Sequence, residues 1–597
     1  MRHAAERFAL SRGIAQESSI ARDEALDSLD PIVRALARRR IATWLRRAEL
    51  LTASPDPIHR MRLAYLLAAA HDVTAPDDVA ATRAAVDALP APASAGRKGP
   101  WLLGLLVGAA LMCAGAALGL RAYFKPIRLE SSPAGQIMGA DLTRFVVAVG
   151  QDDAQLQQEL ITSMTGPAAS QALSVRGANQ LLALLRSMQA LHRGKGSDPV
   201  PLIEAFKNRT LAFDKALEDM KLPFFVDSDT FTTKDWPEPV ARSYYIQRES
   251  RAVSGASRMR VLQLWRLDRL NVRQTVLGYT RPNTPAAIVL LDQVESDLVR
   301  FTLPAASPGG TLDLVDDLSR GLGEAWVTEV EQRASERVGA YYRASGAFSE
   351  PAARLGKLLQ RRKELLKKWD ASLRGQGLEL NVPKRLFAPP SYTAQLGLRV
   401  PRADREEWDS IEAELRERLP DFEALRDRFV RGVERHEIQH RIDYGRGLIP
   451  VPASLCSWLG VMNPLDAPAG GLAARARDEE SAYLAELGRD DDSPLLDLVI
   501  LSNFVLNRET RNPPYTYAAL AAYAAMGKAL GIDVDTVLGR SISRQNFAKL
   551  AVLLWERPPD ELRKAARRAY AAEFGAEWAT VTREAGHENP RYRPEPY

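Results

Sequence analysis

An uncharged stretch of twenty residues, Trp101 to Leu120, constrains the fold of this chain more than any other feature. A helix rises about 1.5 Å per residue, so a stretch of this length matches the roughly 30 Å hydrocarbon core of a bilayer. Basic residues flank it, with Arg97 and Lys98 before it and Arg121 after it. A helix buried in a protein core is rarely apolar on every side and then bordered by charge. The sequence therefore predicts a single transmembrane helix at 101–120.

The residues around this stretch set the expected orientation. Five arginines lie between positions 38 and 47, ahead of the apolar stretch. Because cytoplasmic flanks of membrane helices are rich in lysine and arginine, we expect a cytoplasmic N-terminus. The large C-terminal part would then lie outside the cytoplasm, as in a single-pass protein of a bacterial inner membrane. Gly104 and Gly108 have the spacing at which two membrane helices approach closely, which would also allow a homodimer.

The whole chain predicts a mixed α+β fold in which helices dominate. Residues 1–95 have the pattern of short amphipathic helices followed by a linker, and 96–125 hold the predicted transmembrane helix. Residues 126–310 combine helical segments with strand-like runs, namely SYYIQRESRAV, RMRVLQLWRLDRL and AAIVLLDQV. Residues 311–597 are mostly helical and carry the residues with the clearest chemistry. We therefore expect four regions, of which the last is the catalytic one.

The charge of the chain argues against nucleic acid as a partner. Its 80 basic and 75 acidic residues give a net charge of +5. A nucleic-acid binder concentrates an excess of positive charge on one face, and this chain has little excess to concentrate. No glycine-rich phosphate-binding motif follows a predicted strand, so nucleotide chemistry is not expected either.

The segment LPDFEALRDRFVRGVERHEIQHRIDYGRG holds the most specific pattern in the chain. His436 and His440 are four residues apart, so on a helix their imidazoles lie one turn above each other and can bind one metal ion. They continue an apolar series that runs from Phe422 to Val433 in steps of three or four, so both are expected to face inward. Glu437 can accept a proton from a metal-bound water as general base. The alternative interpretation is two core histidines that only satisfy hydrogen bonds.

HEIQH resembles the HExxH signature of the zincin metallopeptidases, matched here by His436, Glu437 and His440. The resemblance implies a Zn²⁺ ion and a third protein ligand later in the chain. The metzincin branch does not fit, because Asp443 and Arg446 stand where that branch has glycine and histidine. The gluzincin branch takes instead a glutamate from a later helix, often followed three residues on by a small residue.

The segment RARDEESAYLAELGRD fits the gluzincin pattern, with Glu479 followed by Ala482. The resemblance therefore makes Glu479 the expected third zinc ligand, and Glu480 and Glu486 stay open as alternatives. Asp443, one turn after His440, is expected either to orient an imidazole or to lie on the surface.

Two further features of zincins have candidates in this chain. The strand that lies beside the substrate would be SYTAQLGLRV, at 391–400. The side chain that stabilises the oxyanion stays open among four residues, Tyr483, Tyr515, Tyr517 and His587.

Together these residues predict a membrane-anchored zinc metallopeptidase that acts on a peptide or protein substrate. Its zinc ligands would be His436, His440 and Glu479, and Glu437 would be its general base. The alternative, from another class, is a membrane-tethered interaction protein whose zincin-like domain is inactive or uses zinc structurally. The intact Glu437 argues against it, because a structural site needs no general base. Metal-assisted hydrolysis of a substrate other than a peptide also stays open.

Overall fold

The computed structural model describes residues 132–597, apart from the positions 234–235, 269, 271–275, 282–283, 285, 375–384, 389–399, 448, 466, 469, 540–542, 590–591 and 594–597. The chain divides into two compact units, Met1–Ala116 and Ala117–Tyr597, and every described residue belongs to the second. The described residues therefore cover most of the expected regions 126–310 and 311–597. The expected regions 1–95 and 96–125 lie outside them.

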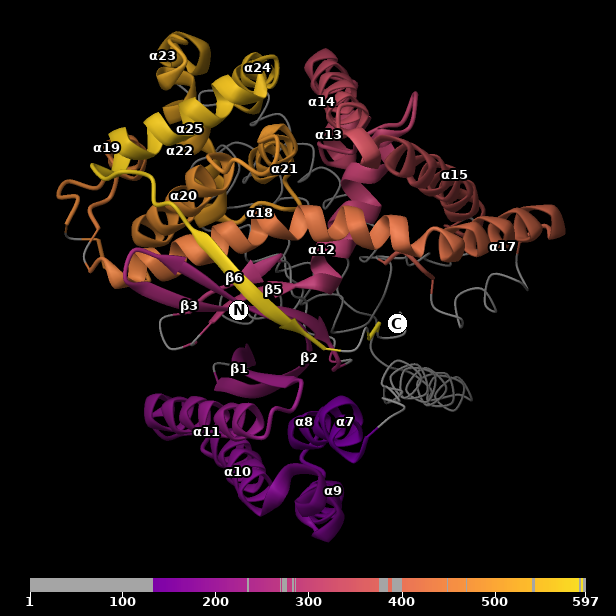
Figure 1. Cartoon of the computed structure of the whole chain (residues 1–597), viewed down its shortest axis with the longest axis vertical. Coiled ribbons are helices and arrows are strands. Elements are labelled where there is room, and N and C mark those ends of the chain that lie inside the picture. Colours follow the sequence, from indigo (N-terminus) through magenta and orange to yellow (C-terminus); the bar gives the residue numbers. More distant parts are fainter. Residues whose placement is uncertain are drawn as a thin grey trace, which may run out of the picture. The chain divides into compact units, whose positions relative to one another are not determined.

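Helices form the first part of the described chain (Figure 1). Two of them begin after an aspartate whose side chain accepts a hydrogen bond from a backbone N–H in the first turn of the helix. Leu156 N donates to Asp153 at 3.0 Å, and Val200 N donates to Asp198 at 3.0 Å. One long helix is kinked at Ser174, where φ is 56°. The elements are α7 (Pro133–Gln136), the π-helical turn η2 (Ile137–Asp141), α8 (Leu142–Gly150), α9 (Ala154–Thr165), α10 (Pro167–Arg193) and α11 (Pro199–Asp219).

The strands form one sheet with the order β1-β2-β3-β5-β4, and β6 pairs with part of β2. The strands of this sheet are β1 (Phe224–Thr233), β2 (Trp236–Ser254), β3 (Ser257–Arg266), β4 (Gly278–Tyr279), β5 (Ala286–Leu290) and β6 (Thr582–Glu588). β1, β2 and β3 pair antiparallel, whereas β3 and β5 run parallel. The three strand-like runs of the sequence overlap β2, β3 and β5, and β4 stands at the end of the sheet beside β5.

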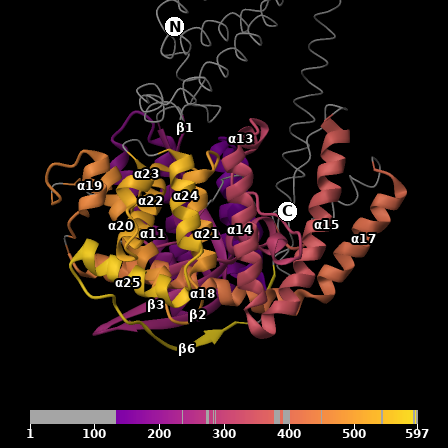
Figure 2. The same cartoon turned by 90° about the horizontal axis from the view of Figure 1, so that it is seen from above.

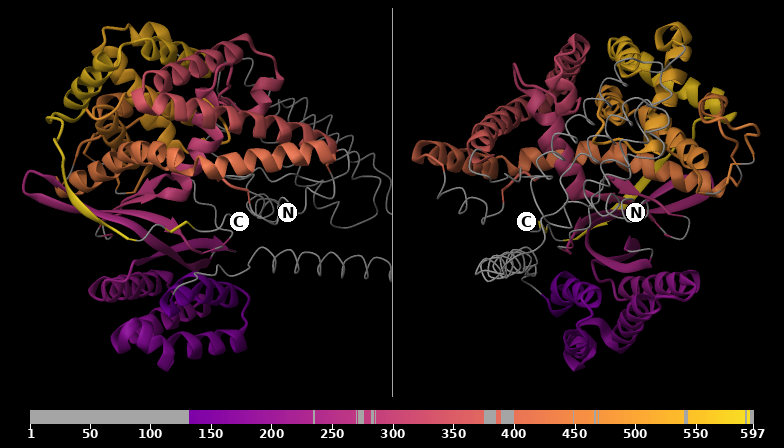
Figure 3. Two further views of the ribbon diagram at one scale, coloured as in Figure 1. Left: turned by 45° about the vertical axis from the view of Figure 1, so that its right-hand side comes forward. Right: turned by 180° about the vertical axis from the view of Figure 1, so that it is seen from behind.

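Helices cover both faces of this sheet, as Figures 1 and 3 show. α8, α10 and α11 lie against one face, and α12 (Leu291–Asp297) and α18 (Leu419–Gly445) against the other. All five residues of β5 are buried, as expected for an apolar strand covered on both sides. Ile438 of α18 packs against Val261 of β3 and Ala287 of β5. The helix that carries HEIQH is therefore held directly on the centre of the sheet.

The remaining helices build a layer around α18. Figure 2 shows α20, α21, α22 and α24 grouped together, and α20 packs against both α18 and α22. Hydrogen bonds join the helices of this layer: Trp555 Nε1 donates to Tyr523 Oη at 2.9 Å, and Tyr523 donates to the Leu498 carbonyl at 2.6 Å. The elements are η3 (Leu298–Thr302), η4 (Leu303–Ala306), α13 (Asp317–Gly321), α14 (Ala325–Arg343), η5 (Gly346–Phe348), α15 (Ser349–Arg374), α17 (Arg402–Glu417), α19 (Ala453–Leu459), α20 (Leu472–Leu487), α21 (Leu495–Leu506), α22 (Pro513–Ala529), α23 (Val534–Leu538), α24 (Arg544–Trp555) and α25 (Pro559–Phe574).

The expected transmembrane helix requires a correction. Within 132–597, wherever the structure describes the chain, no helix combines the length and the apolar character needed to cross a membrane. The long helices α10, α15 and α18 carry charged residues among the apolar ones, as helices packed on one side do. The segment 101–120, and the homodimer contact expected on it, lie outside the described residues. The described fold is therefore helix-dominated α+β without a membrane span, and the expected single-pass location in an inner membrane is withdrawn.

Candidate metal centre

Helix α18 presents both histidines of HEIQH on its inward face. The apolar series before them, from Phe422 to Val433, is buried along the same side of the helix. The side chains of His436 and His440 are only 12% and 8% exposed. Gly447, with φ of +80°, adopts the left-handed backbone just beyond the end of this helix. The packing of one helix face thus brings two imidazoles to the same buried place.

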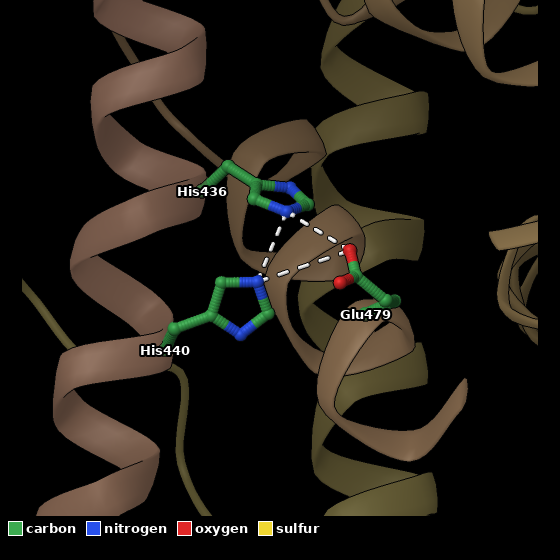
Figure 4. A group of neighbouring side chains, drawn as sticks. All are labelled: His436, His440 and Glu479. Atoms are coloured by element: carbon green, nitrogen blue, oxygen red, sulfur yellow. Dashed lines mark hydrogen bonds and ion pairs between the residues drawn. The ribbon is translucent and has the colours of Figure 1, made fainter. Parts of the chain in front are cut away.

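Three donor atoms meet between α18 and α20 (Figure 4). The Nε2 atoms of His436 and His440 are 3.2 Å apart, and Glu479 Oε2 lies 3.3 Å from the first and 3.8 Å from the second. A tetrahedral zinc with bonds of about 2.0–2.1 Å separates its ligands by about 3.3 Å. Two imidazole nitrogens and one carboxylate oxygen are also donors that zinc accepts. In spacing and in chemistry, these three side chains fit a single ion.

The two alternative glutamates of α20 occupy different surroundings. Glu480 is fully buried, and neither of its carboxyl oxygens has a hydrogen-bond partner among the described residues. Burial, and then the charge of Glu573, raises the pKa of Glu480 well above its ordinary value. Glu486 places Oε2 3.3 Å from Nδ1 of His436, on the side of the imidazole away from His440. Of the three glutamates, only Glu479 reaches the two Nε2 atoms.

The carboxyl group of Glu437 lies beside the end of the sheet. Thr280, just after β4, donates its hydroxyl to Glu437 Oε2 at 3.0 Å, and the same hydroxyl lies 3.1 Å from the Glu437 carbonyl oxygen. Gly278 leaves room for this carboxyl, because a Cβ there would lie 2.8 Å from both Cγ and Oε1 of Glu437. The sheet edge therefore holds Glu437 next to the three-donor cluster.

Burial and neighbouring charges shift the protonation of the site. Burial raises the pKa of Glu437 to about 8, against the opposing charge of His436. Burial alone would lower the pKa of His436, but its contacts with Glu479 and Glu486 raise it to about 10. Burial lowers the pKa of His440 to about 4. At neutral pH the metal-free site thus pairs one imidazolium with a neutral imidazole, and a bound cation would take the place of the His436 proton.

Gly278 and Thr280 are parts of the site that the sequence did not indicate. They come far before the motif and belong to no recognisable pattern, so only the fold brings them to Glu437. The strand expected beside the substrate, at 391–400, lies almost wholly outside the described residues. In the described sheet, the strand next to Glu437 is β4.

Two of the four oxyanion candidates lie at the cluster. The ring of Tyr483 is centred 4.9 Å from that of His436. The ring of Phe504 lies between those of Tyr483 and Tyr515, with centroids 6.3 and 5.5 Å away. Burial, and then the charges of Glu479 and Glu437, raises the pKa of Tyr515. The other two lie elsewhere. Tyr517 packs against the cluster that contains Val451 and Leu455. Nε2 of His587, a residue of β6, lies 3.2 Å from Oδ1 of Asn589.

Among the described residues, the hydrogen-bond partners of the Asp443 carboxylate are not the two imidazoles. Its carboxylate accepts hydrogen bonds from Gln439 at 2.8 Å and from Ser481 at 2.7 Å. Gln439 also donates to Tyr570 of α25 at 2.9 Å. Asp443 therefore belongs to a buried network that joins α18, α20 and α25, and the carboxylate that contacts Nδ1 of His436 is that of Glu486.

In comparisons with known proteins, the chain matches no family model, no curated protein sequence and no solved structure.

Proposed function

We propose that this chain is a zinc-dependent hydrolase whose substrate is a peptide or protein. The observation that carries the proposal is the meeting of three donor atoms, from His436, His440 and Glu479, at mutual distances of 3.2 to 3.8 Å. A set of three protein ligands is typical of catalytic zinc, because it leaves a fourth position for water or substrate, whereas structural zinc is held by four. The resemblance of HEIQH to the zincin signature supports the same conclusion.

The residues around the cluster have distinct roles in such a reaction. A zinc ion held by His436, His440 and Glu479 would make a water molecule acidic and would polarise the carbonyl oxygen of the substrate. Glu437 accepts the proton of the attacking water and later passes it to the leaving amine. Burial raises the pKa of Glu437 to about 8. The positive charge of a zinc ion held by the three ligands would lower this pKa and favour the carboxylate form, which accepts a proton. Thr280 holds the carboxylate in place through Oε2.

The position of β4 favours a peptide over other substrates. β4 is the last strand in the order of the described sheet, and it lies directly beside Glu437. An extended peptide can add to such an edge through backbone hydrogen bonds. A peptide held there would bring its carbonyl group close to Glu437 and to the three donors. Tyr515, whose pKa is raised by burial and by the charges of Glu479 and Glu437, carries the hydroxyl that we assign to the oxyanion.

Metal content and hydrolysis, measured on the same preparations, test the proposal. The full-length protein is stripped with a chelator, reconstituted with zinc, and analysed for metal per chain and for cleavage of an unstructured protein such as casein. We expect about one zinc per chain in the parent, and loss of that zinc in His440→Gln and Glu479→Ala. Glu437→Gln should keep the zinc and lose cleavage by at least about 100-fold, since it removes the proton acceptor. Glu480→Gln is the matched control on the same helix and should retain both.

Three outcomes would contradict this assignment. Absence of zinc in the reconstituted parent would remove the metal centre altogether. Zinc that persists in Glu479→Ala would move the third ligand to another residue. Zinc bound by the expected residues, with no hydrolysis of peptides in any condition, would favour the non-catalytic interaction protein.

A further inference from the structure

Helix α20 contacts the imidazole of His436 from several directions. Glu479 Oε2 lies 3.3 Å from Nε2, and Glu486 Oε2 lies 3.3 Å from Nδ1. Between them in the sequence, Tyr483 places its ring 4.9 Å from the imidazole, centre to centre. These three residues are spaced by four and then three positions, so they share one face of the helix. The ring of His436 is therefore enclosed by a single stripe of α20.

A glycine on α18 makes the contact with Glu486 possible. Gly432 lies one turn before His436, and a Cβ at this position would lie 2.9 Å from Glu486 Oε1 and 2.4 Å from a guanidinium nitrogen of Arg489. Any larger residue would push the carboxylate or the guanidinium aside. The absence of a side chain at 432 thus leaves the space in which Glu486 reaches the histidine.

Arg489 anchors this carboxylate from the other side. Its guanidinium is almost fully buried, lies 3.9 Å from Glu486 Oε1, and donates to Asp497 at 2.6 Å. Asp492, 3.8 Å from the same guanidinium, accepts a hydrogen bond from Tyr341 of α14 at 2.8 Å. Glu486 is therefore one end of a buried series of charges that reaches into the surrounding helices.

We propose that Glu486 is a positioning residue for the metal centre, acting through His436. An imidazole whose Nδ1–H donates to a carboxylate keeps Nε2 free for a metal and cannot turn about its own axis. Glu486 holds His436 so that its Nε2 faces His440 and Glu479, and Gly432 and Arg489 keep Glu486 in that position. The inference rests on the proposed metal site and assigns Glu486 a role that excludes it as a ligand.

Metal affinity, measured on the full-length protein, tests this role directly. Zinc dissociation constants are obtained by competition with a chromophoric chelator, and the visible absorption of the Co²⁺-loaded protein reports the geometry around the metal. We expect Glu486→Ala to weaken zinc binding by about 10- to 100-fold, the usual effect of removing such a partner. The Co²⁺ bands should shift or broaden as well. Glu486→Gln keeps an oxygen that accepts the Nδ1 proton, so it should restore part of the affinity and most of the spectrum.

A second pair of variants reaches the same contact without removing a polar atom. Gly432→Ala displaces Glu486 and Arg489, and should weaken zinc binding in the same direction as Glu486→Ala. Gly445→Ala is its matched control on the same helix, since a Cβ at 445 meets nothing within 4 Å. Glu480→Gln is the control for loss of a buried carboxylate on α20. Both controls should bind zinc with the parent affinity.

The possible failures of the two proposals are distinct. If the parent binds zinc through His436, His440 and Glu479 and all Glu486 variants bind it equally well with unchanged Co²⁺ spectra, the positioning role is wrong and the proposed function stands. Loss of peptide cleavage at unchanged zinc affinity would also overturn a role through His436. A parent that binds no zinc would overturn the proposed function, and the positioning role with it.

Discussion

The hydroxyl of Thr280 donates to the carboxylate of Glu437 at 3.0 Å, across the boundary between the sheet edge and helix α18. These two residues are far apart in the sequence, yet both are buried at the same place. The contact fixes one oxygen of the group that we assign as general base, and Gly278 makes room for the other. Catalytic alignment in this protein thus depends on the sheet as well as on the motif helix.

Replacing Thr280 should therefore affect catalysis but not metal binding. We expect Thr280→Val, which has the same shape without the hydroxyl, to lower kcat by about 10-fold or more through misplacement of the base. Thr280→Ser, which keeps a hydroxyl, should recover most of the activity. Zinc content per chain, measured alongside, should be equal in all three proteins. A loss of zinc in Thr280→Val would show that this residue supports the ligands instead.

Glu480 should make the protein less stable as the pH rises. Its pKa in the folded protein lies well above the ordinary value of about 4.5, first because of burial and then because of the Glu573 charge. The folded state therefore binds this proton more tightly than the unfolded chain. The resulting stability is complete below about pH 4.5 and is lost as the pH rises toward the folded pKa.

Glu480→Gln cannot ionise and should remove this dependence. We expect the variant to gain unfolding free energy relative to the parent between about pH 5 and pH 8, by roughly 1 to 3 kcal/mol at the upper end. Urea unfolding at three pH values in this range measures the difference. A difference that stays constant with pH would show that Glu480 keeps the same protonation in both states.

Tyr515 should contribute to the chemical step alone. Removing one hydrogen-bond donor to an oxyanion commonly lowers kcat by about 100- to 1000-fold. The loss is smaller where a second group also stabilises the oxyanion, as the metal would here. We expect Tyr515→Phe to lower kcat by about 10- to 100-fold, with little change in KM or in zinc affinity. Tyr517→Phe, which alters a tyrosine packed around α19, is the matched control. Equal activity in parent and Tyr515→Phe would leave Tyr483 as the remaining candidate.

Zinc should stabilise the folded chain against heat. A ligand that binds only the folded state at 100 times its Kd adds about 2.7 kcal/mol to the free energy of unfolding. We therefore expect a higher Tm with zinc than after chelation, and no such shift in His440→Gln. Differential scanning calorimetry of both proteins, with and without metal, measures this. A similar shift in the two proteins would place the stabilising zinc elsewhere in the chain.

Several features of the fold followed from local patterns in the sequence. The three strand-like runs overlap β2, β3 and β5, because alternation and β-branched residues act over a few neighbouring positions. In the run AAIVLLDQV, β5 ends at Leu290 and α12 begins at Leu291. The run of apolar residues alone therefore did not predict where the strand ends. The apolar stretch at 101–120 suggested a membrane span that no described helix provides.

The sequence by itself determined that His436 and His440 share one face of a buried helix, because the helical period places residues four apart on the same side. The resemblance to zincins favoured Glu479 as the third donor, but the sequence left Glu480 and Glu486 open as alternatives to that choice. That choice depends on how α20 is rotated against α18, which is decided by packing across both helices. The same tertiary packing placed Glu486 beside Nδ1 of His436 and Thr280 beside Glu437. Spacing within one helix is local information, whereas contacts between elements arise only when the whole core closes.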